Sequence, residues 1–133
     1  MIGIIDYDAG NLKSVEKALI ALGEEVCVTR DRHELNRADK VILPGVGNFG
    51  DAMEKLKSFG LVDVIKETAE SGKPFLGICL GLQLLFEKSE EAPGVEDLGI
   101  LKGEILRIPD GVGLKVPHIG WNSLKRKNQG RLF

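Results

Sequence analysis

The 133 residues suit one domain, and lysine plus arginine number 18 against 20 for aspartate plus glutamate, a formal net charge of −2. This balance excludes a generally basic nucleic-acid-binding protein. Hydrophobic residues make up 43% of the chain, as in globular proteins, and the longest nearly apolar run, residues 75–86, is shorter than the roughly 20 residues of a membrane span. We therefore expect one folded domain over residues 1–133, with no nucleic-acid or membrane partner.

The two cysteines, Cys27 and Cys79, are too few for a disulfide framework, and neither has a metal-binding spacing. No basic region precedes an apolar stretch near residue 1, so no secretory signal is expected. These features predict a cytoplasmic protein with free thiols and without a metal or cofactor.

The first two thirds of the chain alternate short β-branched runs with amphipathic segments. This pattern predicts strands over residues 2–6, 26–29, 41–43 and 74–79, helices over 12–22, 51–71 (broken near Gly60) and 80–87, and a charged connection over 30–39. Such alternation is typical of a flavodoxin-like α/β fold, a parallel sheet flanked by helices. Residues 100–108 and 114–124 alternate apolar residues with glycine and proline, which predicts hairpin strands and a β-rich C-terminal third.

The sharpest chemical signal is Gly77-Ile78-Cys79-Leu80-Gly81, a Gly-x-Cys-x-Gly turn between an expected strand and helix. In such a nucleophile elbow the thiol is held out on a strained backbone, and flanking glycines avoid clashes. The backbone N–H of Leu80 could then bind an oxyanion. The alternative is that Cys79 is a small buried structural residue, the usual role of a cysteine. For Cys27, which lies within an expected strand, we expect this structural role.

A second signal is the glycine-rich segment Pro44–Gly50, which follows an expected strand. It is not a phosphate-binding Walker loop, because no Gly-Lys-Ser/Thr follows. Its backbone amides could supply a second oxyanion donor or hold an amino-acid substrate. The alternative is a tight turn between a strand and a helix.

Five segments together carry a family resemblance. They are Asp6-Tyr7 with Gly10-Asn11, Leu43–Gly50, Gly77–Glu87, Ser89-Glu90-Glu91 and Pro117–Asn122. In these segments the chain resembles the class I glutamine amidotransferases, and among them the glutaminase subunits of imidazole glycerol phosphate synthase. The resemblance implies that Cys79 attacks the carboxamide of glutamine and forms a glutamyl thioester.

The resemblance also implies roles for other residues. Leu80, Val46 and Gly47 would form the oxyanion hole, and Gly47 and Gln83 would bind glutamine. Asn11, His118, Trp121 and Asn122 would face a (β/α)8 barrel cyclase subunit. That partner would use the ammonia to make imidazole glycerol phosphate and aminoimidazole carboxamide ribotide in histidine biosynthesis.

The chain departs from the family pattern in two places. The family supplies its base and orienting group as a His-x-Glu pair, and neither histidine, His33 or His118, is followed two residues later by glutamate. We therefore expect an incomplete domain, cut at its C-terminal side and inactive by itself. In addition, Asp8 stands where glycine is usual. Two alternatives remain open: a non-catalytic fragment that docks on the cyclase, and a flavodoxin-like binding module.

Overall fold

Four parallel strands form the central sheet of the computed structural model, which describes residues 1–111 and 113–130. They are β1 (Ile2–Ile5), β2 (Val26–Thr29), β3 (Lys40–Leu43) and β4 (Phe75–Gly77), in the order β2–β1–β3–β4. The parallel sheet expected from the sequence is confirmed. Residue 112 and residues 131–133, where the chain was expected to stop inside a domain, lie outside the described part.

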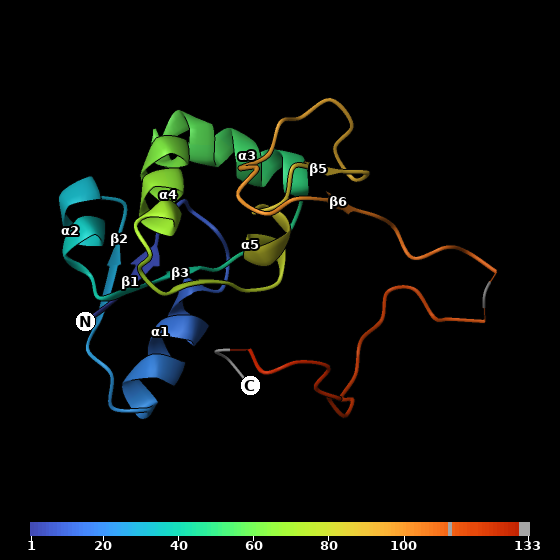
Figure 1. Cartoon of the computed structure of the whole chain (residues 1–133), viewed down its shortest axis with the longest axis horizontal. Helices are drawn as coiled ribbons and strands as arrows, with labels where there is room; N and C mark the ends of the chain where they lie inside the picture. The colour runs from blue at the N-terminus through green and yellow to red at the C-terminus, as the bar shows by residue number, and fades with distance from the viewer. Residues whose placement is uncertain (112, 131–133) are drawn as a thin grey trace.

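Helices lie on both faces of the sheet (Figure 1). One face carries α1 (Leu12–Ala21), and the other carries α2 (Arg32–Arg37), α3 (Phe49–Ser58) and α4 (Leu61–Glu70). The first crossover moves to one side of β1 and the next two move to the other, so right-handed connections place their helices on opposite faces. No helix in the described part is long and apolar enough to cross a membrane.

The hydrophobic core lies between the sheet and the three helices α2, α3 and α4 that cover one of its faces. Leu35, Leu56 and Ile65 of these helices are fully buried against Ile5 and other sheet residues. By contrast, α1 has no fully buried residue. The expected break near Gly60 is confirmed, since Gly60 has a φ of 65° and separates α3 from α4.

The expected charged connection over residues 30–39 is wrong in part, because it contains α2. Asp31 begins this helix, and its side chain accepts hydrogen bonds from the N–H groups of His33 and Glu34. The signal was present in the sequence: Asp31 followed by Glu34 is the spacing of a capping box.

The helix expected over residues 80–87 is only one turn long, α5 (Leu80–Gln83). A helix that continued to residue 87 would bond the N–H of Glu87 to the carbonyl of Gln83, but this N–H donates to the carbonyl of Gly103 at 3.1 Å. The N–H groups of Leu98 and Gly99 donate to the carbonyls of Leu84 and Phe86, and Leu101 donates to Leu85. Leu85 and Phe86 donate to the carbonyls three residues back, Leu82 and Gln83, so the chain tightens into a turn and continues toward residues 98–103.

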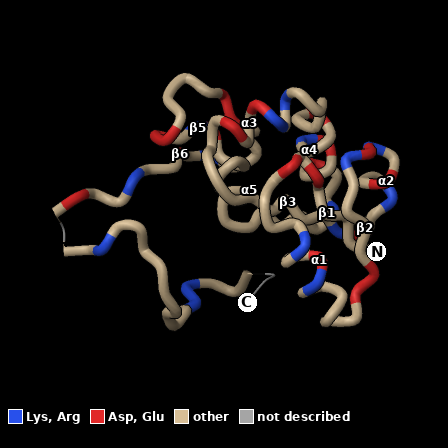
Figure 2. Tube along the Cα trace, turned by 180° about the vertical axis from the view of Figure 1, so that it is seen from behind, with Lys and Arg blue, Asp and Glu red and all other residues tan. Residues whose placement is uncertain are grey.

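The β-rich C-terminal third is also wrong for the part that the structure describes. Only β5 (Lys88–Ser89) and β6 (Glu104–Ile105) are present there, as a parallel pair rather than a hairpin. Residues 113–130 run outside the helices and the sheet and carry only basic charges (Figures 1 and 2). No hydrogen bond in the described residues joins this segment to the sheet, and a strand without a ladder partner does not form.

Candidate functional site

Cys79 lies in a strained turn between β4 and α5. Its φ is 54° and its ψ is −117°, a backbone conformation that residues other than glycine rarely adopt. The thiol is free and the residue is exposed. This geometry agrees with the nucleophile elbow expected from the sequence and contradicts the buried structural cysteine that was its alternative.

The glycines around Cys79 allow backbone segments to touch. A methyl group on Gly81 would overlap the carbonyl oxygen of Leu43, and one on Gly77 would lie 2.6 Å from the Cα of Leu82. One on Gly45 would lie 2.7 Å from the backbone nitrogen of Gly81. The elbow therefore packs directly against the end of β3 and the start of the glycine-rich segment.

The backbone of this glycine-rich segment, Pro44–Gly50, approaches the proposed oxyanion donor. The N–H of Leu80 donates to the carbonyl oxygen of Gly45 at 3.3 Å, so this donor is already paired in the structure. Val46 and Gly47 are exposed, and Gly47 has a φ of 100°. Asn48 begins α3, and its side chain accepts from the N–H of Asp51 at 3.1 Å. The segment is thus anchored at both ends and open in its middle.

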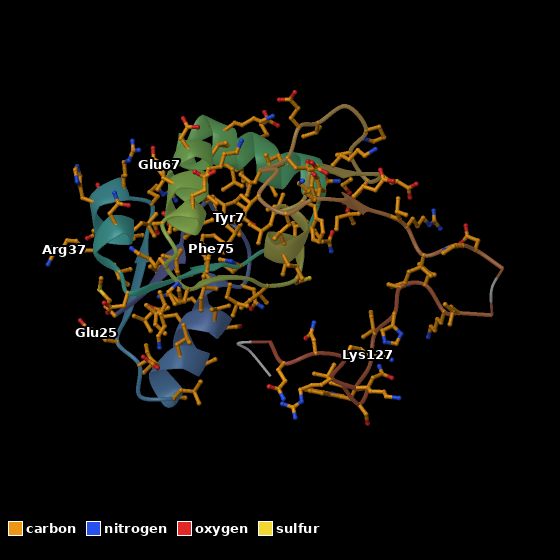
Figure 3. All side chains as sticks on the ribbon, in the orientation of Figure 1. Tyr7, Glu25, Arg37, Glu67, Phe75 and Lys127 are labelled. Carbon is orange, nitrogen blue, oxygen red and sulfur yellow. The ribbon has the colours of Figure 1, made fainter. Side chains whose placement is uncertain are left out.

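Tyr7 was not singled out as a site residue, yet it joins the two regions. Its side chain is buried in the interior (Figure 3), and its hydroxyl donates to the carbonyl oxygen of Pro44 at 2.8 Å. Burial, with a smaller contribution from the nearby Cys79 thiol, raises the pKa of Tyr7 to about 12. The hydroxyl therefore stays protonated and keeps donating. In the sequence, the signal for Tyr7 was its place in Asp6-Tyr7, one of the segments that carry the family resemblance.

The residues expected to bind glutamine line two different cavities. Gln83 lines a cavity of about 800 Å³ together with Ser89, Arg107 and His118. Val46 and Gly47 line a smaller cavity of about 170 Å³, beside Tyr7 and Asp8. The structure thus brings Gly47 close to the first loop, residues 6–11, and places Gln83 among residues of the C-terminal part.

The residues expected to face a partner are exposed. Asn11 has a φ of 73°, and its side chain makes no capping hydrogen bond to α1. Trp121 is fully exposed, and the side chains of His118 and Asn122 contact each other at 2.9 Å. No described hydrogen bond or ion pair links Asn11 to the segment that contains His118 and Trp121.

The other histidine, His33, lies in α2 and is exposed. Among the described residues, no group of three or more histidine, cysteine or acidic side chains could hold a metal ion.

Comparison with known proteins gives a consistent result. The family model described as "Glutamine amidotransferase class-I" matches residues 3–133. The imidazole glycerol phosphate synthase subunit HisH of Aquifex aeolicus is 55% identical over 98% of this chain and 62% of its own length. The proteins of the same name from Moorella thermoacetica and Methanocaldococcus jannaschii are 56% and 53% identical, over 99% and 100% of this chain and 62% and 65% of their own lengths. The chain thus spans less than two thirds of these relatives.

A solved structure also resembles the chain. The crystal structure of a glutamine amidotransferase aligns with a TM-score of 0.69 and 24% identity, over 86% of this chain and 59% of that one. At this identity the likeness concerns the fold alone.

Proposed function

The chain belongs to the class I glutamine amidotransferase family, and we propose that it supplies the cysteine nucleophile of a glutaminase that delivers ammonia to a cyclase subunit in histidine biosynthesis. The observation that carries this proposal is the backbone of Cys79, which is strained, exposed and flanked by glycines that no larger residue could replace without overlap. Strain of this kind is typical of functional sites, because ordinary packing has no use for it.

In the proposed reaction the Cys79 thiolate attacks the carboxamide carbon of glutamine. The carbonyl π electrons move onto oxygen, and this oxyanion would be bound by the N–H of Leu80 and by the Val46-Gly47 backbone. The carbonyl then re-forms as the C–N bond breaks, the proton that the thiol gave up passes to the nitrogen, and ammonia departs while the glutamyl thioester remains on Cys79. Water hydrolyses the thioester to glutamate and restores the thiol. Gly47 and Gln83 would hold the substrate.

Two features bear on how this chain could perform the reaction. The N–H of Leu80 is paired with the Gly45 carbonyl, so the proposed oxyanion hole requires that carbonyl to move away. The 133 residues also hold no His-x-Glu pair to accept the thiol proton. For the chain by itself we therefore propose that the thiol can be trapped covalently but that glutamine turnover is very slow.

The partner in this proposal is a (β/α)8 barrel cyclase subunit. Its support is the exposure of Asn11 and of the segment around Trp121, together with the basic residues Lys115 and Lys125 on that segment. An apolar and basic surface fits an acidic partner face. We also place the protein in the cytoplasm, because both of its cysteines carry free thiols.

Covalent trapping tests the proposal without requiring turnover. The probe is a glutamine-like diazoketone, 6-diazo-5-oxonorleucine, and the labelled cysteine is identified by mass spectrometry. We expect labelling of Cys79, protection by excess glutamine, and loss of labelling in Cys79→Ala. Cys27 is the internal control, and iodoacetamide reports general thiol reactivity. Equal labelling of both cysteines without protection by glutamine would refute the proposal and favour a flavodoxin-like binding module.

Glutamate release is then measured with a cyclase subunit and its nucleotide ligand present. Turnover that depends on Cys79 would show that a base comes from elsewhere in the complex. Binding to the cyclase without any trapping or turnover would support the non-catalytic docking alternative.

A further inference from the structure

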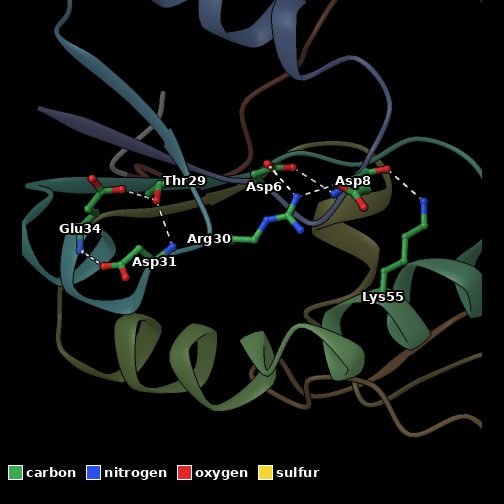
Figure 4. A network of polar contacts seen from close by, with 7 residues as sticks. All are labelled: Asp6, Asp8, Thr29, Arg30, Asp31, Glu34 and Lys55. Atoms are coloured by element: carbon green, nitrogen blue, oxygen red, sulfur yellow. Dashed lines mark hydrogen bonds and ion pairs between the residues drawn. The ribbon is translucent and has the colours of Figure 1, made fainter.

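One arginine connects three segments near the candidate site. Arg30 directly follows β2, and its Nη2 lies 2.9 Å from Oδ2 of Asp6 and 2.6 Å from Oδ1 of Asp8 (Figure 4). Its guanidinium carbon also lies 4.2 Å from the centre of the Phe59 ring, at the end of α3. Arg30 therefore links the first loop, residues 6–11, to the end of β2 and to α3.

The first loop adopts a conformation that needs such support. Asp8 has a φ of 58° and Asn11 a φ of 73°, both in the left-handed region that favours glycine. Asp8 occupies a position where the family resemblance leads one to expect glycine. Besides Arg30, two contacts hold it: its N–H donates to Oδ1 of Asp6 at 3.1 Å, and Nζ of Lys55 donates to its carbonyl oxygen at 3.0 Å.

The carboxylates that Arg30 contacts are charged partners. Partial burial acts to raise the pKa of Asp6, but the hydrogen bonds from Arg30 and from the Asp8 N–H together hold it below its ordinary value. A second exposed arginine, Arg32, pairs with the single carboxylate of Glu67 on α4, which is the ordinary surface arrangement. Arg30 differs from it by bridging two carboxylates and an aromatic ring.

The first loop in turn contacts the glycine-rich segment. A methyl group on Gly10 would lie 2.9 Å from Cγ2 of Val46, so the loop backbone lies directly against this side chain. The Tyr7 hydroxyl donates to the Pro44 carbonyl at 2.8 Å, and the cavity of about 170 Å³ is lined by the same two segments together with residues of α3. A shift of the loop at Asp8 would therefore move or release Val46.

From these contacts we infer that Arg30 is a positioning residue: by holding Asp8 in its left-handed conformation, it fixes Gly10 against Val46 and sets the position of the Val46-Gly47 backbone. The catalytic meaning of this inference rests on the proposed function, in which that backbone meets glutamine. The mechanical link between Arg30 and Val46 does not, and it can be measured without substrate.

The test uses the full chain, ¹⁵N relaxation and the variants Arg30→Ala, Arg30→Lys and Arg32→Ala. In the parent chain we expect the amides of Val46 and Gly47 to have order parameters of about 0.85, and in Arg30→Ala values of about 0.6 or lower. Arg30→Lys keeps the charge but lacks the planar group that stacks on Phe59, so an intermediate value is expected. Arg32→Ala removes a comparable ion pair and should change neither amide.

Hydrogen exchange gives a second measurement on the same variants. The Leu80 amide, bonded to the Gly45 carbonyl, should exchange about fivefold faster in Arg30→Ala, the size expected for loss of an exposed ion pair. Unchanged order parameters at Val46 and Gly47 in a folded Arg30→Ala chain would overturn the inference, as would an equal effect of Arg32→Ala. Diazoketone trapping of Cys79 in the parent chain is a separate measurement. Its absence would count against the proposed function, whereas unchanged Val46 and Gly47 amides would count only against the link between Arg30 and Val46.

Discussion

The most informative stability prediction concerns Asp97, a buried carboxylate that no described residue hydrogen-bonds. The residue is 8% exposed, and neither carboxylate oxygen has a hydrogen-bond donor among the described residues. Burial raises the pKa of Asp97 to about 6 from 3.8, although the nearby Lys57 acts in the opposite direction. We predict that Asp97→Asn stabilises the fold at neutral pH, because it removes a charge that burial disfavours.

The size of the effect follows from the shift in pKa. Because the pKa of Asp97 is about two units higher in the folded state, the protonated side chain favours folding. This favourable contribution is fully present below pH 3.8 and is lost as the pH rises through about 6. The charged carboxylate then costs up to about 3 kcal/mol at pH 7.5 and about 0.6 kcal/mol at pH 4. The increase in the free energy of unfolding caused by Asp97→Asn should therefore be larger at pH 7.5 than at pH 4.

The assay is urea denaturation, followed by circular dichroism, at pH 4 and pH 7.5. The control is Glu96→Gln, which removes the charge of the neighbouring but exposed carboxylate and should change the free energy of unfolding by less than about 0.5 kcal/mol at both values. An equal gain from Asp97→Asn at both pH values would refute the reasoning, since a gain in packing does not depend on protonation. No gain at pH 7.5 would refute it as well.

Three further predictions concern the candidate site, each measured as the free energy of unfolding. Gly81→Ala should destabilise the fold by at least about 3 kcal/mol, because the added methyl group overlaps the Leu43 carbonyl; a smaller loss would show that the elbow can move away from β3. Cys79→Gly should be more stable than Cys79→Ala by about 1 kcal/mol, because only glycine adopts a φ of 54° without strain, and equal stabilities would contradict that strain. Tyr7→Phe should cost about 1–2 kcal/mol through the lost bond to the Pro44 carbonyl, whereas no loss would mean that the hydroxyl contributes little to holding the glycine-rich segment.

Local patterns were sufficient for much of the fold. The alternation of short apolar runs with amphipathic segments predicted the parallel sheet, and Gly60 predicted the break between α3 and α4. These signals succeed because burial on the two faces of a sheet, and the conformational freedom of glycine, act on residues close together in the chain. The same is true of the elbow, since Gly77 and Gly81 flank Cys79 directly.

The sequence by itself therefore determined the parallel sheet, the positions of its first three strands and the identity of the strained cysteine. Only the tertiary structure decided where α5 ends, which carbonyl the Leu80 N–H meets, and how Arg30 and Tyr7 hold the loops beside the site. The physical reason is shared. Each of these features depends on a hydrogen bond or ion pair between residues more than ten positions apart, and the geometry of such a bond exists only once the sheet has brought the loops together.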